Sequence, residues 1–169
     1  MFQLKPIEKA AITRALAKAE RYRLLNEPRE AESICRDVLA VDPDNQEAKI
    51  SLALAMTDLF SMQPTSPQEA RRLVASLRSE FDREYFSGVV EERWGKRLFS
   101  DPHMSRGAPH HILAAMRHFE RADALAEPGN DDAVLRWNTC VRMLERAGYD
   151  PEALDHDHES IVDEDMPIR

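Results

Sequence analysis

The chain has 169 residues, which is long enough for one domain or one array of repeats with a hydrophobic core. Only five residues are glycine and no segment alternates cleanly between apolar and polar residues, so we expect an all-α fold. The formal net charge of -8 argues against nucleic acid as a partner, because nucleic-acid binding requires a basic face. No apolar stretch could span a bilayer and the N-terminus lacks a signal-peptide core, so we expect a cytoplasmic protein that does not bind membranes.

The first predicted pair of helices covers Ile12–Pro43. Its first helix sets small Ala19 one turn before large Tyr22, and its second helix sets small Ala31 one turn before Cys35. Two helices approach closely where a small side chain of one faces a large side chain of the other, so this pattern predicts a packed helical hairpin. The proline at the end of the range cannot continue the second helix.

The second predicted pair begins directly after that proline. Asp44 and Glu47 have the spacing of an N-cap and its capping-box partner, and the small and large residues recur at Ala53 and Met56. A longer turn leads to the second helix of the pair. An N-cap, a first helical residue and three packing positions are expected in this second helix: Ser66, Pro67, Ala70, Val74 and Leu77.

The third predicted pair is marked by Trp94 and Gly95 in its first helix and by Ala115 and Phe119 in its second. An insertion that contains several turn residues separates these two helices. One further first helix follows, and Gly148 is expected to act as its C-terminal cap. The pattern therefore predicts three to four helix pairs in succession.

The interval of about 34 residues between Ala19 and Ala53 resembles the period of the tetratricopeptide repeat family. The family's first-helix pattern is Trp-x-x-Leu-Gly-x-x-Tyr, and Ala19 and Tyr22 occupy its small and last positions while the first two positions depart from it. The second-helix pattern Ala-x-x-x-Phe is met by Ala31 and Cys35, with cysteine in place of phenylalanine.

The resemblance implies a right-handed α-solenoid of three to four tetratricopeptide-like helix pairs over residues 1–149, followed by an acidic tail at 150–169. Members of the family bind other proteins, so the chain is expected to be an adaptor or assembly factor and not an enzyme. No phosphate loop or nucleophile elbow occurs in the sequence, and no cofactor is expected.

In this family the first helix of each repeat lines a concave groove that binds a peptide or helix of a partner. The matching positions in this chain are Leu16, Glu20, Arg23, Ile50, Leu54, Thr57, Glu92, Lys96, Trp137 and Val141. Family members that hold the C-terminal carboxylate of heat-shock chaperones use a lysine and asparagine pair in the first two such helices. Those places hold Leu16, Glu20, Ile50 and Leu54 in this chain, so that role is not expected. An apolar stripe flanked by charges suits an amphipathic helix or an extended peptide.

Two alternatives stay open for the groove. Ile50, Leu54 and Trp137 are either anchors for a partner or part of the core. If they are exposed, the groove could instead be buried in a homodimer, which would make the chain a structural homo-oligomer.

The two cysteines and several of the histidines are candidates for chemistry. Cys35 and Cys140 stand where helix-packing residues belong, so they are expected to be buried, reduced thiols. His111 and His118 share a helix face, but no spacing typical of a metal site occurs, so no metal is expected. A histidine-based metal enzyme or sensor is the lesser alternative.

The tail at 150–169 holds eight acidic residues and one arginine, which accounts for nearly all of the net charge. One interpretation is that this segment does no more than keep the protein in solution. Apolar residues such as Ile161 and Ile168 also allow a docking motif, either for a partner or for arginine-bearing surfaces of the repeats around Arg71, Arg72 and Arg78.

Overall fold

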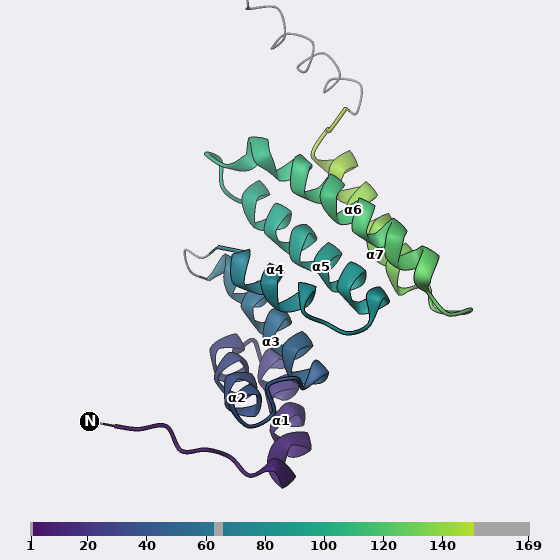
Figure 1. The fold of residues 1–169 in the computed structure, drawn as a ribbon. Helices are drawn as coiled ribbons and strands as arrows, with labels where there is room; N and C mark the ends of the chain where they lie inside the picture. Colours follow the sequence, from purple (N-terminus) through teal and green to yellow (C-terminus); the bar gives the residue numbers. More distant parts are fainter. Residues whose placement is uncertain (1, 63–65, 151–169) are drawn as a thin grey trace, which may run out of the picture.

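The structure is a computed structural model that describes residues 2–62 and 66–150, and every regular element in those ranges is a helix (Figure 1). The expected all-α fold is therefore confirmed. The acidic tail lies outside the described residues, apart from Asp150. The elements are η1 (Lys9–Ala11), α1 (Ile12–Leu24), α2 (Pro28–Val41), α3 (Gln46–Asp58), η2 (Leu59–Ser61), α4 (Gln68–Ala75), α5 (Glu80–Phe99), η3 (Ser105–Gly107), α6 (Ala108–Leu125) and α7 (Asp132–Arg146).

Each α-helix packs against the next one along the chain. The alternate helices also contact one another in series, α1 with α3, α3 with α5 and α5 with α7. The helices consequently stack in chain order, from α1 and α2 at the bottom of Figure 1 to α6 and α7 at the top. This arrangement places the four odd-numbered helices side by side.

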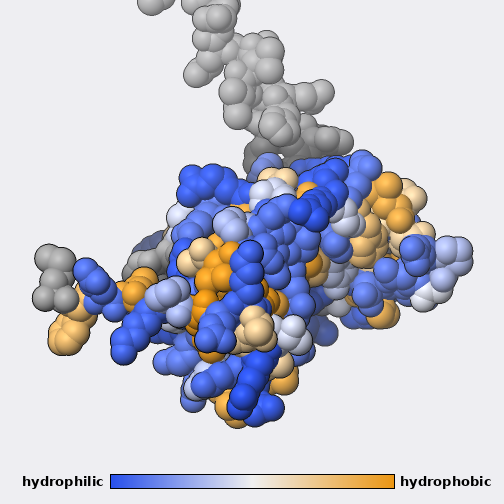
Figure 2. Space-filling view, turned by 60° about the horizontal axis from the view of Figure 1, so that its bottom comes forward, coloured by the Kyte–Doolittle hydropathy of each residue, from blue (hydrophilic) through white to orange (hydrophobic). Residues whose placement is uncertain are grey.

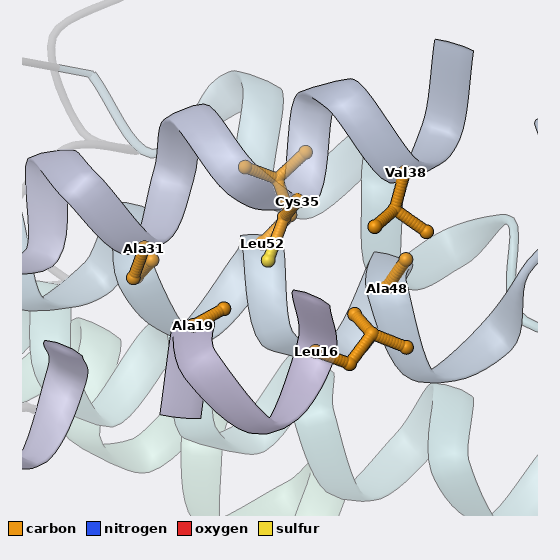
Figure 3. Close-up of a cluster of buried hydrophobic side chains, with 8 residues drawn as sticks. Leu16, Ala19, Ala31, Cys35, Val38, Ala48 and Leu52 are labelled. Atoms are coloured by element: carbon orange, nitrogen blue, oxygen red, sulfur yellow. The ribbon is translucent and has the colours of Figure 1, made fainter. Parts of the chain in front are cut away.

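The small residues expected at the first helix crossing lie in the core. Ala19, Ala31 and Cys35 are fully buried in one cluster that joins α1, α2 and α3 (Figure 3). Leu16 and Leu52 fill the space that these small side chains leave. The predicted hairpin of α1 and α2 is thus confirmed, and the cluster extends it to the following helix.

Helix ends follow the expected chemistry at two places. Gly148 has a φ of 65°, and the amide of Tyr149 bonds the carbonyl of Leu144 at 3.1 Å, so α7 ends in a Schellman motif as predicted. Asn26 ends α1 in the same way, with a φ of 60°. Asparagine is the residue that most often replaces glycine in this conformation.

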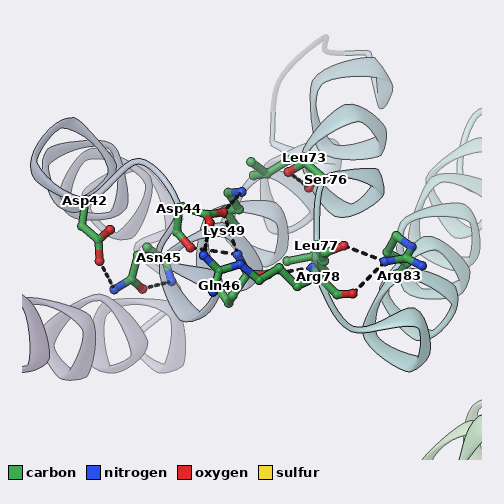
Figure 4. A network of polar contacts seen from close by, with 11 residues as sticks. Asp42, Asp44, Asn45, Gln46, Lys49, Leu73, Ser76, Leu77, Arg78 and Arg83 are labelled. Carbon is green, nitrogen blue, oxygen red and sulfur yellow. Dashed lines mark hydrogen bonds and ion pairs between the residues drawn. The ribbon is translucent and has the colours of Figure 1, made fainter.

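The predicted N-cap of α3 at Asp44 is wrong by one residue. The cap is Asn45, whose side chain accepts a hydrogen bond from the amide of Ala48 at 2.9 Å. Asp44 instead forms ion pairs with Lys49 and with Arg78, as Figure 4 shows. The pair with Arg78, which follows α4, connects the loop before α3 to the loop before α5.

The start of α4 is one residue later than predicted. The helix begins at Gln68, and Pro67 takes the N-cap place. Ser66 lies one residue before the N-cap, and its hydroxyl accepts a hydrogen bond from the amide of Gln68 at 3.3 Å. Ala70, Val74 and Leu77 are buried as expected.

Helices α5 and α6 make the most extensive contact in the described part of the chain. Two glycines of α5 allow it. A Cβ atom at Gly88 would lie 2.5 Å from the ring of Phe119, and one at Gly95 would lie 2.7 Å from Cδ1 of Ile112. Gly95, Ala115 and Phe119 of the predicted third pair therefore lie at this crossing, whereas Trp94 packs against Phe60.

Figure 2 views the molecule from the end where α1 and α2 lie. Hydrophilic residues cover most of this face, and a smaller patch of hydrophobic residues lies between them. The molecule therefore presents a mainly polar surface on this side.

Candidate functional site

A hollow of about 550 Å³ lies where the odd-numbered helices meet. It is lined by side chains from α1, α3, α5 and α7 and by residues that follow these helices. Five of the ten predicted groove positions contribute to its wall: Glu20, Arg23, Thr57, Glu92 and Lys96. We call this the central hollow. The predicted positions thus converge in space, although they come from three separate helices.

A second hollow of about 540 Å³ lies between α5 and α7. Glu92, Lys96 and Ser100 line both hollows, so the two adjoin along α5. Phe99 and Met143 add apolar surface to the second one. We call this second one the α5–α7 hollow, and the two together the groove.

The other five predicted positions line neither hollow. Leu16 is 3% exposed and belongs to the first core cluster, so it is not available to a partner. Ile50, Leu54 and Trp137 are half-buried and pack against core clusters of the second and third units, and Val141 is also half-buried. The physical reason is that apolar residues on these helices face the neighbouring helices. The central hollow is therefore lined mainly by charged and polar residues, and the apolar residues of the α5–α7 hollow, Phe99 and Met143, are not among the predicted ones.

Asp58 at the end of α3 joins two arginines across the central hollow. Its Oδ2 accepts a hydrogen bond from Nε of Arg23 at 2.8 Å, and its Oδ1 pairs with Arg93. Arg93 also donates to the hydroxyl of Thr57 at 2.8 Å, and that hydroxyl donates to the carbonyl of Leu54 at 2.7 Å. Helices α1, α3 and α5 are linked by this chain of bonds, so Arg23 and Thr57 already have partners inside the protein.

Glu92 links α5 to α7 in the same region. The Glu92 side chain is 6% exposed, and its Oε2 lies 3.2 Å from Nη1 of Arg136. Burial lowers the pKa of Arg93, and the neighbouring cations of Arg23 and Arg136 lower it further, while Asp58 opposes this shift. Arg23, Arg93 and Arg136 share the two carboxylates of Asp58 and Glu92, so this part of the groove has one positive charge in excess.

The walls of the groove carry seven cationic side chains and three carboxylates. The carboxylates are Glu20, Asp58 and Glu92. A fourth, Asp101, lies outside the walls and is 3.6 Å from Arg97. The cations are Arg23, Arg93, Lys96, Arg97, Arg136, Arg142 and Arg146. Chemically, the groove is suited to hold anionic groups.

The two histidines that share a face of α6 pair with glutamates of α5. Nδ1 of His111 lies 2.7 Å from Oε2 of Glu91, and Nδ1 of His118 lies 2.7 Å from Oε2 of Glu84. In the described part of the chain, no three histidine, cysteine or acidic side chains are grouped so that they could hold a metal ion. These histidines contribute to the contact between α5 and α6.

The two cysteines are free and fully buried, as predicted. Burial raises the pKa of Cys35 to about 11 and that of Cys140 to about 12. Both thiols are therefore protonated at neutral pH and are poor nucleophiles.

Residues that the sequence pattern did not indicate complete the groove. Asp58 and Arg93 each follow a predicted position directly, and Arg136 precedes one. Arg142 and Arg146 lie one helical turn apart on α7, and that i, i+4 spacing was the available signal. Their significance depends on their distance from α5, which a sequence pattern does not report.

These features define the chain as an all-α protein in which side chains of α1, α3, α5 and α7 line a charged hollow. None of the described helices combines the length and the apolar character needed to cross a membrane. The chain matches no protein-family model, no curated protein and no solved structure.

Proposed function

We propose that the chain is a protein-interaction module, a right-handed α-solenoid of tetratricopeptide-like helix pairs that holds a segment of a partner protein in the groove. It would act as an adaptor or assembly factor and not as an enzyme. The repeat spacing of about 34 residues supports the solenoid, and so do the serial contacts among odd-numbered helices.

One observation carries the proposal. Positions assigned to a partner groove from the repeat pattern alone, among them Glu20, Thr57 and Lys96, line a single hollow although they come from three helices. A concave surface built from successive repeats is the usual binding face of a solenoid. The charged walls favour a polar segment with anionic side chains over an apolar helix.

Self-association through the groove is the second candidate, and the charges weigh against it. A twofold contact brings the same surface patch of two copies together. Such a contact would place the surplus cations of both copies face to face, which is unfavourable.

A photo-crosslinking experiment tests the proposal. Ser100 lines both hollows, and Ser33 is an exposed serine of α2 outside the groove. Each is replaced, in separate variants, by a benzophenone amino acid in cells of the source organism. We expect a discrete adduct with another protein from position 100 only. An equal adduct pattern from position 33, or no adduct from position 100, would contradict the proposal.

A further inference from the structure

Three cations of the groove have no ion pair within residues 2–62 and 66–150. Lys96 on α5 and Arg142 and Arg146 on α7 line the α5–α7 hollow and are exposed. The other cationic side chains of the groove each pair with a carboxylate, as Arg23 does with Asp58. The unpaired positive charge of the groove is therefore concentrated at the α5–α7 hollow, where an anionic group would be bound most favourably.

The same hollow also offers apolar surface. Phe99 and Met143 are partly buried against the second core cluster, and both line the hollow. A suitable occupant would combine carboxylates with apolar side chains at short intervals.

The chain itself contains a segment of that composition. Residues 151–169 hold seven acidic residues and one arginine, interleaved with apolar residues such as Ile161, Val162 and Met166. The segment begins four residues after Ala147, which lines the α5–α7 hollow. Its 19 residues could extend over about 60 Å, so the whole hollow is within reach.

We propose that residues 151–169 of the chain dock in the α5–α7 hollow. Their carboxylates would face Lys96, Arg142 and Arg146, and their apolar side chains would contact Phe99 and Met143. A tether raises the effective concentration of a segment near its site to the millimolar range, so weak ion pairs are sufficient.

Of the three arginines that the sequence suggested as docking points, Arg72 is a single exposed cation with no ion pair within the described residues, and the other two already have carboxylate partners. Arg71 donates to Glu91 at 2.6 Å, and Arg78 pairs with Asp44. Their charges are already matched by carboxylates of neighbouring helices and loops. The α5–α7 hollow is therefore a better docking site for residues 151–169 than the surface around α4.

The contact has a consequence that rests on the proposed function. A partner segment that enters the groove would compete with residues 151–169, so the tail would lower the affinity for the partner. The contact itself exists independently of any partner. It can therefore be measured in the isolated full-length chain.

Paramagnetic relaxation measurements test the contact. Ser160→Cys introduces one reactive thiol in the tail of the full-length chain, and the two native cysteines are fully buried and will not be labelled. With a nitroxide on this thiol, we expect amide signals of Lys96, Ser100, Arg142 and Arg146 to broaden at low salt. The broadening should be lost in 1 M salt, where the screening length is roughly 3 Å.

Two controls make the test specific. Arg142→Glu with Arg146→Glu should abolish the broadening, whereas Arg14→Glu with Lys18→Glu, exposed residues of α1 outside the groove, should leave it unchanged. A mixture of nitroxide-labelled chains with isotope-labelled chains detects contact between copies. Broadening only in that mixture, broadening centred outside the groove, or none at low salt would overturn the proposal. A docked tail without any crosslinked partner would contradict the proposed function alone.

Discussion

The Nδ1 atom of His111 on α6 lies 2.7 Å from the Oε2 atom of Glu91 on α5. Seven residues earlier on α5, Glu84 makes the equivalent contact with His118, seven residues later on α6. Each glutamate also accepts a hydrogen bond from an arginine, Glu91 from Arg71 at 2.6 Å and Glu84 from Arg121 at 2.8 Å. The two antiparallel helices are thus joined by a repeated polar contact beside the apolar one at Phe119.

The Glu91 contact predicts a dependence of stability on pH. Burial alone would raise the pKa of Glu91, but the hydrogen bonds from Arg71 and His111 outweigh burial and lower it. Because the folded-state pKa is lowered, the stabilisation is present above the unfolded pKa of about 4.3 and is lost as pH falls through the folded pKa. The urea concentration at the unfolding midpoint should therefore decrease as the pH is lowered below about 5. Glu91→Gln should make this decrease smaller.

At pH 7 the same variant should lower the free energy of unfolding by about 1–3 kcal/mol, because Arg71 and His111 lose the charged carboxylate and the glutamine amide offers only one acceptor oxygen. Glu127→Gln is the control, since Glu127 is exposed in the loop after α6. If the pH dependence of stability is the same in Glu91→Gln as in the unchanged protein, Glu91 does not cause the loss of stability at low pH.

Gly88→Ala should destabilise the contact between α5 and α6. Replacing a helical glycine with alanine normally adds up to about 1 kcal/mol of stability. Here the new Cβ would lie 2.5–2.9 Å from three ring atoms of Phe119, so overpacking should dominate and cost about 1–3 kcal/mol. Gly107→Ala is the matched control, because its Cβ would meet only Leu98, at 4.0 Å. Thermal unfolding of both variants tests this expected loss of stability. A raised melting temperature for Gly88→Ala would contradict the packing described.

Asp58→Ala should destabilise the protein through the two arginines that it leaves unpaired. Arg23 and Arg93 would keep their charges in a partly buried place, and we expect a loss of about 1–3 kcal/mol. Glu20→Ala is the control, because Glu20 lies in the same hollow but is exposed. Equal unfolding midpoints for the two variants would mean that the Asp58 bridge contributes little.

Ala31→Leu should overpack the crossing of α1 and α2 at a cost of about 1–3 kcal/mol, because Ala31 is fully buried. Ala17→Leu on the exposed side of α1 should change stability by less than about 0.5 kcal/mol. Chemical denaturation of both variants checks this expectation. An unchanged midpoint for Ala31→Leu would place Ala31 outside the crossing.

Neither native thiol should react with a thiol-specific reagent in the folded protein at pH 8. Cys35 and Cys140 are fully buried, and burial raises the pKa of both well above that pH. Two equivalents should react after denaturation in urea. Reaction of either cysteine at the rate of a free thiol without denaturant would contradict the burial described.

The sequence by itself determined the helices and most of their packing faces. The sequence predicts that Ala19, Ala31 and Gly95 lie at helix crossings, because close helix packing needs small side chains at periodic positions. This periodicity is a local property of the chain. The C-terminal cap at Gly148 is readable for a similar reason, since a left-handed residue is needed wherever a helix ends in this way.

Only the tertiary structure decided which charged residues form ion pairs and which of them line the groove. Asp44 could have capped α3, but Arg78 from a distant loop and Lys49 engage it, and Asn45 takes the cap. The apolar residue Leu54, expected in the groove, instead packs toward the core, and charged residues line the central hollow. An ion pair depends on which residues of separate helices come within a few ångströms, and that distance is set only when the helices cross.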